Sequence, residues 1–282
     1  MSYVKSKHLI LVVEAKKTQL SSIIMIFTTN AYDTPEGTKQ CIWDIFALKT
    51  RFYFVFQFLY IIFKANKVAK HGHFNDAEYC KISDNTFKLV ESCGAKIHVS
   101  GLENISDLKE PVVFISNHMS VLETFLLPGL IIPFRPVSFI VKESLINHPF
   151  FGQVMKATNP VSVSRTDPKK DFKTVMTDGQ RLLKEGRSII VFPQSTRGEF
   201  IADEFNSIGE KLAQKANVPI VPIALKTDFW SVGRVIKDFG PIHRKRKIFF
   251  EFGEPISCTM EKKQRHSHII DFIQSNLKKW YN

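Results

Sequence analysis

A buried strand, a polar turn and the start of a helix follow one another in the stretch Phe114-Ile115-Ser116-Asn117-His118-Met119-Ser120-Val121-Leu122-Glu123. The apolar run from Val112 to Ile115 has the length and β-branched content of a buried strand. A second apolar segment, from Val121 to Leu127, has the spacing of a helix. In α/β folds, functional side chains gather where a strand ends and a helix begins, so this stretch is the first candidate site.

The candidate chemistry rests on a histidine and a glutamate. His118 and Glu123 are separated by about 500° of ideal helix, so they would not share a face if both were helical. They meet if His118 lies in the turn and Glu123 in the first winding of the helix. The carboxylate would then hold one ring nitrogen and leave the other as a general base. The alternative is a turn histidine beside a glutamate that complements the helix dipole, and the spacing alone does not decide between them.

Beyond this stretch the chain alternates between predicted strands and helices. We expect strands at residues 97–99, 137–141, 161–165, 188–192, 218–225 and 248–252, and helices at residues 75–93, 172–184, 207–216 and 261–280. Gly186 is expected to terminate the second helix of this group, the one at residues 172–184. This alternation predicts an α/β fold, with a central, mostly parallel or mixed β-sheet flanked by helices.

The composition favours an anionic partner. The chain has 282 residues, a formal net charge of +12 and four scattered cysteines without a CxxC pair. Such cysteines are typical of reduced thiols in a protein that faces the cytosol. The basic run at residues 243–247 is short, and no zinc-finger spacing or RNP-like motif accompanies it, so we expect no nucleic-acid partner.

An aromatic run defines the second of three predicted segments. Residues 52–63 are apolar except for Gln57 and have basic residues on both sides. A helix of this length spans about 18 Å, short of the roughly 30 Å hydrocarbon core. We therefore predict a membrane-associating helical segment at 41–72, between an N-terminal segment of unknown role at 1–40 and an α/β domain at 73–282. A buried core helix is the first alternative, and a full membrane span is the second.

Three cationic residues follow predicted strands. Lys142 comes after the strand at 137–141, Arg165 ends the strand at 161–165, and Arg197 lies shortly after the strand at 188–192. Ligands of open α/β sheets bind at the carboxyl ends of the strands, so these residues and His118 can converge on one crevice. Lysine and arginine there would suit a phosphate. Each of them alone is more often a solvated surface charge.

Four sequence blocks carry a resemblance to a known family. They are Asn117-His118-x4-Glu123, residues 161–165, Phe192-Pro193-Gln194-Ser195-Thr196-Arg197-Gly198 and Val218-Pro219-Ile220-Val221-Pro222. In this order and spacing they resemble the glycerolipid acyltransferase superfamily of the PlsC type, in particular the lysophosphatidic acid (1-acylglycerol-3-phosphate) O-acyltransferases. The resemblance covers roughly residues 95–258.

The resemblance implies acyl transfer from a thioester, either acyl-CoA or acyl carrier protein, to a lysophospholipid hydroxyl, with phosphatidic acid as the expected product. His118 would be the general base and Glu123 its support, and no metal or bound cofactor is expected. The phosphate-binding residues would be Arg165, Arg197 and Lys142. Further substrate contacts would come from Gln194, Ser195, Thr196 and Gly198. The partner would be a membrane phospholipid surface, with the protein on its cytoplasmic face.

The chain departs from the family pattern in two blocks. Glu123 stands where the family usually has aspartate, and Gln194-Ser195 replace the usual Glu-Gly. Glutamate keeps the charge but changes its reach, whereas glutamine carries no charge. These departures leave the acceptor open, so another acceptor such as glycerol-3-phosphate or a different lysolipid is one alternative. A catalytically inactive membrane lipid-binding protein is the other.

Overall fold

The computed structural model describes residues 31–149, 151–194, 196–234 and 236–282. Its strands are β1 (Tyr32–Asp33), β2 (Ile97–Ser100), β3 (Val113–Ser116), β4 (Val137–Lys142), β5 (Val161–Val163), β6 (Ser188–Val191), β7 (Ile220–Lys226) and β8 (Ile248–Phe252). The helices are α2 (Ile42–Phe46), α3 (Arg51–Lys70), α4 (Asp76–Ser92), α5 (Glu103–Ser106), α6 (Leu122–Ile131), α7 (Glu143–Ile146), α8 (Gly152–Ala157), α9 (Pro168–Lys184), α10 (Ile208–Ala216) and α11 (Lys262–Tyr281).

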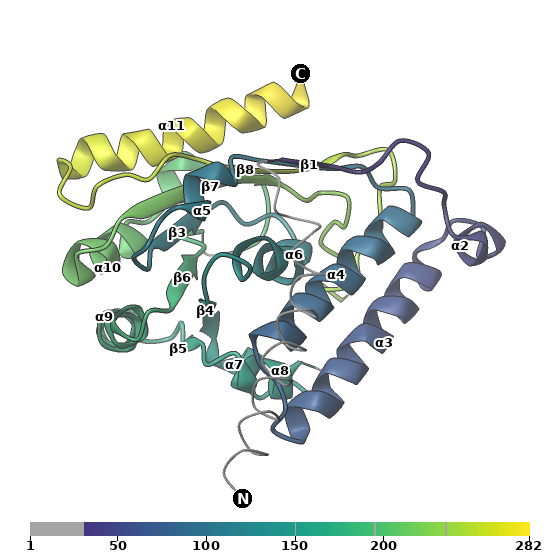
Figure 1. Cartoon of the computed structure of the whole chain (residues 1–282), viewed down its shortest axis with the longest axis horizontal. Coiled ribbons are helices and arrows are strands. Elements are labelled where there is room, and N and C mark those ends of the chain that lie inside the picture. The colour runs from purple at the N-terminus through teal and green to yellow at the C-terminus, as the bar shows by residue number, and fades with distance from the viewer. Residues whose placement is uncertain (1–30, 150, 195, 235) are drawn as a thin grey trace, which may run out of the picture.

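The described strands form one mixed sheet of eight in the order β1-β2-β8-β7-β3-β6-β4-β5. The five strands from β7 to β5 run parallel to their neighbours, whereas β8 is antiparallel to β7 and β1 to β2. Helices surround this sheet (Figure 1). The predicted α/β class with a mostly parallel or mixed central sheet is therefore confirmed.

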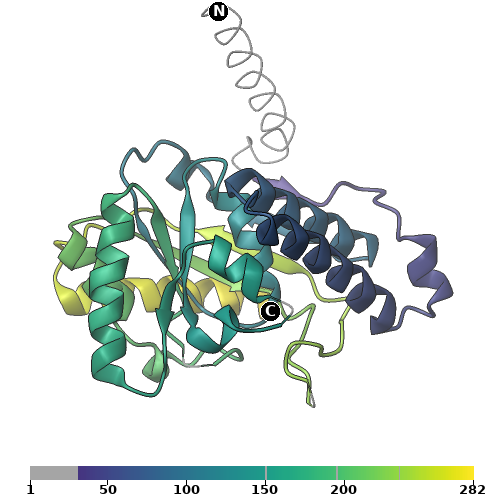
Figure 2. The same cartoon turned by 90° about the horizontal axis from the view of Figure 1, so that it is seen from below.

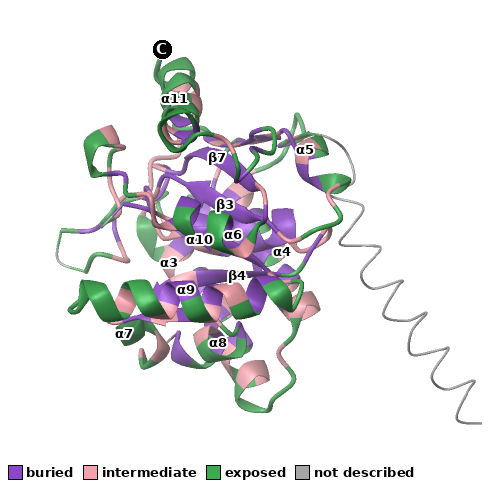
Figure 3. Cartoon of the chain, turned by 90° about the vertical axis from the view of Figure 1, so that its left-hand side faces the viewer, coloured by how far each residue is buried: buried purple, intermediate pink, exposed green. Residues whose placement is uncertain are grey.

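Helices cover both faces of the sheet because successive strand residues point to opposite sides. Phe114 of β3 belongs to the cluster that β4, β6 and β7 share with α3, α4 and α6. Its neighbours Val113 and Ile115 belong to the cluster formed with α9, α10 and α11. Figure 3 shows the buried strands at the centre and the exposed sides of the helices outside. Both faces of the central strands are thus covered.

Helix α9 begins four residues before the predicted start at residue 172. Asp167 caps it by accepting hydrogen bonds from the amides of Lys169 and Lys170, and Pro168 follows in the first turn. The apolar pattern missed this first turn because its residues are charged, whereas capping and the proline specify it. At the other end Gly186 has a positive φ of 84°, and its amide donates to Leu183. The predicted glycine terminator is confirmed.

The aromatic run lies in α3, which has two apolar faces. Phe54 and Phe58 are buried in the core, where their rings meet Trp230 edge-on with both ring centroids at 4.8 Å. Phe52 and Phe56 are about 200° around the helix from Phe54 and are about 70% exposed. The core interpretation thus holds for one face of α3, and the other face is open. Figure 2 shows α3 and α4 side by side at one side of the molecule. Across the described residues, every helix is too short or too polar to cross a bilayer.

Candidate active site

The candidate site lies at the carboxyl edge of the parallel strands. β3 pairs with β6 and β7, β6 pairs with β4, and β4 pairs with β5, all in parallel. The segments that follow these strands therefore emerge at the same edge. His118 follows β3, and the Gln194–Gly198 loop follows β6. Lys142 ends β4, and Arg165 follows β5.

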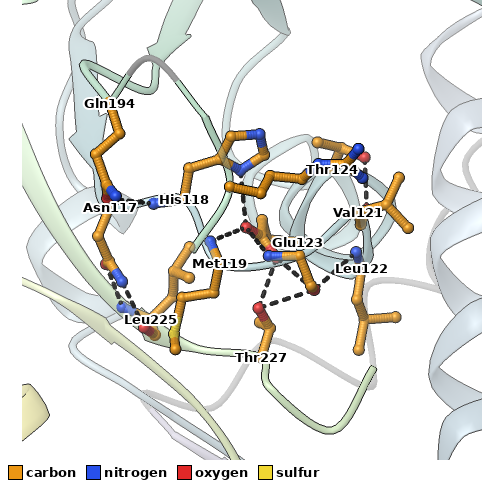
Figure 4. A network of polar contacts seen from close by, with 12 residues as sticks. Asn117, His118, Met119, Val121, Leu122, Glu123, Thr124, Gln194, Leu225 and Thr227 are labelled. Atoms are coloured by element: carbon orange, nitrogen blue, oxygen red, sulfur yellow. Dashed lines mark hydrogen bonds and ion pairs between the residues drawn. The ribbon is translucent and has the colours of Figure 1, made fainter. Parts of the chain in front are cut away.

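His118 lies in the turn after β3 and Glu123 in the first turn of α6, and the two side chains meet. Nδ1 of His118 is 2.8 Å from Oε1 of Glu123, and the imidazole stacks on Phe192 with ring centroids 4.2 Å apart. An ionised carboxylate only accepts hydrogen bonds, so Nδ1 carries the proton and Nε2 has a free lone pair. In Figure 4 this second nitrogen points away from Glu123. The arrangement is that of a general base held in one tautomer.

Glu123 is fully buried but surrounded by donors. Its Oε1 accepts from the amides of Met119 and Ser120, at 2.7 and 2.9 Å, and its Oε2 accepts from the hydroxyl of Thr227 at 2.6 Å. The Ser120 hydroxyl lies 2.8 Å from Oε2. Burial alone would raise the pKa of Glu123, but the hydrogen bonds from His118, Thr227 and Ser120 and the charge of His118 hold that pKa below its ordinary value. The carboxylate therefore stays charged and can stabilise a protonated His118.

Two amide side chains hold the turn in place. Asn117 is fully buried and exchanges two hydrogen bonds with the backbone of Leu225 in β7, at 2.8 and 2.9 Å. Gln194 accepts from the amide of His118 at 2.9 Å and donates to the carbonyl of Glu199 at 3.1 Å. The Gly198 amide donates to the His118 carbonyl at 3.0 Å. The loop after β6 and the turn after β3 are thus locked together (Figure 4).

The three predicted phosphate-binding residues lie at increasing distance along the edge. Strands in a sheet are about 4.8 Å apart. By this spacing, β6 is about 5 Å from β3, β4 about 10 Å and β5 about 14 Å. Arg197 follows β6, Lys142 ends β4 and Arg165 follows β5. Lys142 and Arg165 are exposed, whereas Arg197 is half-buried. Of the three, Arg197 therefore follows the strand that lies next to β3.

Comparisons with known proteins agree with this geometry. The model of the Acyltransferase family matches residues 96–226, which include β2, β3, β6 and β7 and all the predicted site residues. The similarity to this family thus covers less than half of the chain.

Two similar proteins are named 1-acyl-sn-glycerol-3-phosphate acyltransferase. The Pseudomonas aeruginosa protein is 37% identical over 134 residues, which are 46% of this chain and 49% of that protein. The Saccharomyces cerevisiae protein is 30% identical over 135 residues, which are 47% of this chain and 43% of that protein. The chain thus matches about half the length of these relatives or less.

The chain also resembles the crystal structure of the 1-acyl-sn-glycerophosphate (LPA) acyltransferase PlsC from Thermotoga maritima. The TM-score is 0.58 at 20% identity, covering 84% of this chain and 93% of that one, and this likeness concerns the fold.

Sequence reasoning missed two of the residues that donate hydrogen bonds to the Glu123 carboxylate, which together form what we call the Glu123 cage. Ser120 and Glu123 have the spacing of a capping box, S-x-x-E, and the amide of Leu122 donates to the Ser120 hydroxyl at 3.1 Å. This motif was readable from the sequence. Thr227 follows β7, 104 positions from Glu123, and no local pattern indicates it.

The other residues predicted to contact substrate are Gln194, Ser195, Thr196 and Gly198, and the structure gives them different surroundings. Gln194 is 6% exposed and both ends of its amide are used within the protein. Gly198 contributes its amide to His118, and Thr196 is exposed. Ser195 lies outside the described residues. Their contact with substrate stays a prediction. Within the described residues, no cluster of three or more His, Cys, Asp or Glu side chains is placed to hold a metal ion.

Changing Gln194 to Glu is expected to destabilise the fold, although glutamate is the usual residue at this position of the resembled family pattern. The carboxylate can still accept from the His118 amide, but it cannot donate to the Glu199 carbonyl and places a charge beside that oxygen. We expect the free energy of unfolding to fall by about 1–2 kcal/mol, measured by urea denaturation. Gln180→Glu is the matched control, because Gln180 donates to the Lys215 carbonyl at an exposed position. Equal stability of Gln194→Glu and the unchanged protein would contradict the bracing role.

Proposed function

We propose that this protein transfers a fatty acyl group from an acyl thioester to the free hydroxyl of 1-acylglycerol-3-phosphate and forms phosphatidic acid. The observation that carries the proposal is the His118–Glu123 pair, with a charged, buried carboxylate behind a histidine whose Nε2 is free. The names of the similar proteins point to the same acceptor.

The pair supports direct transfer without an acyl-enzyme intermediate. Nε2 of His118 takes the proton of the acceptor hydroxyl while that oxygen attacks the thioester carbonyl carbon. The new carbon–oxygen bond forms, the tetrahedral intermediate collapses, and the carbon–sulfur bond breaks. The protonated His118 then returns the proton to the leaving thiolate. Glu123 stabilises the imidazolium during this sequence because it stays ionised next to Nδ1.

Arg197 supplies the phosphate recognition in this proposal. The Gly198 amide that follows it is bonded to the His118 carbonyl, so Arg197 is held close to the base. A guanidinium suits the forked geometry of a phosphate. Lys142 and Arg165 lie farther along the same edge and would contribute attraction more than contact.

An acyl-transfer assay tests the proposed function. Purified protein in detergent or vesicles is given acyl-CoA, and separately acyl carrier protein thioester, with a panel of lysolipids and glycerol-3-phosphate. We expect phosphatidic acid from lysophosphatidic acid as the main product. Turnover with a different acceptor alone would correct the acceptor. No product from any pair of substrates would overturn the enzyme assignment in favour of a lipid-binding protein.

We also propose that the protein works on the cytoplasmic surface of a membrane, through the open face of α2 and α3. This face consists of Ile42, Trp43, Ile45, Phe46, Leu48, Phe52, Phe56, Tyr60 and Phe63, all exposed. The basic residues Lys49, Lys64 and Lys67 accompany it. Aromatic rings beside cationic side chains suit the interface of an anionic bilayer. The buried face of the same helix contacts Phe125, two residues after Glu123, so the site lies directly behind the proposed membrane face.

Replacing Trp43 and Phe46 together with serine is expected to reduce binding to vesicles that contain anionic phospholipid. These side chains are 67% and 70% exposed, so their loss removes apolar surface without opening a cavity. A loss of about 1.5 kcal/mol per buried aromatic side chain, about 3 kcal/mol for the two, predicts a roughly hundredfold weaker partition, measured by vesicle sedimentation. Phe172→Ser on α9 is the control, since Phe172 is also exposed but lies outside this face. Equal losses in both variants would argue against a specific membrane face.

A further inference from the structure

The arginine that we assign to phosphate binding already holds an anion. Nη2 of Arg197 is 2.6 Å from Oδ1 of Asp238, with the two side chains 20% and 28% exposed. Asp238 does not belong to the four sequence blocks and lies between β7 and β8. The pair therefore brings a carboxylate from a separate segment to the guanidinium that we assign to the acceptor's phosphate.

Asp238 is carried by a hairpin-like loop that starts just after the Glu123 cage. Trp230 and Ile242 form an antiparallel bridge, and Gly233 donates to the Lys237 carbonyl. The backbone is also tied from outside, because Arg51 at the start of α3 donates to the Phe239 carbonyl at 2.9 Å. Because the backbone beside Asp238 is held, its carboxylate can leave Arg197 by a side-chain rotation alone.

The contacts of Asp238 differ from those of a supporting carboxylate. Glu123 supports His118 from a fully buried position with five donors around it. The Asp238 carboxylate is partly open to solvent and, among the described residues, contacts Arg197 without a second hydrogen bond or ion pair. An ion pair that keeps contact with solvent is weaker than a fully buried one. A dianionic phosphate can therefore replace the carboxylate on the guanidinium, and it would be repelled if the carboxylate stayed.

We propose that Asp238 is a built-in competitor of the acceptor's phosphate, which occupies Arg197 in the free protein and must be displaced when the acceptor binds. The proposal rests on the proposed function, since it concerns the phosphate position of that site. It makes Asp238 a residue that sets the affinity for phosphorylated acceptors. Removing its charge should strengthen acceptor binding, the reverse of what removing a supporting residue would do.

The test compares Asp238→Asn with the unchanged protein. Binding of a short-chain 1-acylglycerol 3-phosphate, below its micelle concentration, is measured by calorimetry, and KM and kcat by the acyl-transfer assay. We expect Kd and KM to fall by roughly two- to fivefold, the effect of an ion pair that keeps contact with solvent, with kcat unchanged. Asp238→Glu keeps the charge and should behave as the unchanged protein. For a phosphate-free monoacylglycerol, Asp238→Asn should leave KM unchanged.

A matched control separates this effect from the general loss of an ion pair. Asp76→Asn removes the acidic partner of Arg187, a pair of similar exposure at 3.1 Å, and should leave Kd unchanged. An equal or higher Kd in Asp238→Asn overturns the inference, and a higher one identifies Asp238 as a support of Arg197. If the unchanged protein neither binds the phosphorylated acceptor nor turns it over, the proposed function fails and the inference fails with it.

Discussion

Replacing His118 with alanine is expected to lower kcat for acyl transfer by about 10²- to 10⁴-fold, the contribution of a positioned general base. The side chain is 16% exposed and its removal leaves the carboxylate cage of Glu123 with its backbone and hydroxyl donors. The fold and vesicle binding should therefore persist. The measurement is single-turnover and steady-state acyl transfer, with circular dichroism to verify folding.

The chain offers a matched control for this experiment. His98 of β2 forms a similar pair, with Nδ1 at 2.8 Å from Oδ1 of Asp33, but both side chains are exposed and β2 lies three strands from β3. His98→Ala should retain activity close to that of the unchanged protein. Near-normal activity in His118→Ala would remove the mechanism proposed above.

Replacing Glu123 with glutamine is expected to cost stability as well as activity. The amide group cannot accept from all the donors that surround the carboxylate, and its own N–H groups would face the amides of Met119 and Ser120. Buried donors left without an acceptor predict a loss of about 2–4 kcal/mol in the free energy of unfolding at neutral pH. Catalysis should fall too, because the imidazolium loses its counter-charge.

The loss of stability in Glu123→Gln should depend on pH, in a direction that follows from the pKa of Glu123. The pKa of Glu123 is lower in the folded protein than its ordinary value of about 4.3 in an unfolded chain. The ionised carboxylate therefore stabilises the fold above that ordinary value, and the stabilisation is lost as the pH falls through the folded-state pKa. The gap in unfolding free energy between the unchanged protein and Glu123→Gln should narrow on acidification, measured by urea denaturation at several pH values. A gap that is constant with pH would show that the charge of Glu123 is not what stabilises the turn.

The variant Glu123→Asp tests whether the charge of the carboxylate or the length of the side chain matters. The shorter side chain keeps the charge, and with it the pH dependence, but it retracts the carboxylate by about one carbon–carbon bond. We expect stability and activity between those of the unchanged protein and Glu123→Gln.

Much of the site was predictable because it is local in sequence. His118 and Glu123 are joined by one turn, and the apolar run before them and the helical spacing after them placed that turn between a strand and a helix. The alternation of buried strands and amphipathic helices predicted the α/β class, since each pattern has its own period. The aromatic segment at residues 52–63 was predictable in composition only, because an aromatic run looks the same whether it faces a core or a bilayer.

The tertiary structure decided what depends on partners distant in the chain. The sequence alone determined the fold class, the order of the elements and the presence of a histidine, a carboxylate and three cations after strands. The packing of β3 against β7 brought Thr227 to Glu123, and the loop after β7 brought Asp238 to Arg197. The tertiary structure also gave α3 one buried and one exposed face. The physical reason is that these contacts join residues through space after the sheet has formed, and no local periodicity or propensity encodes such a pairing.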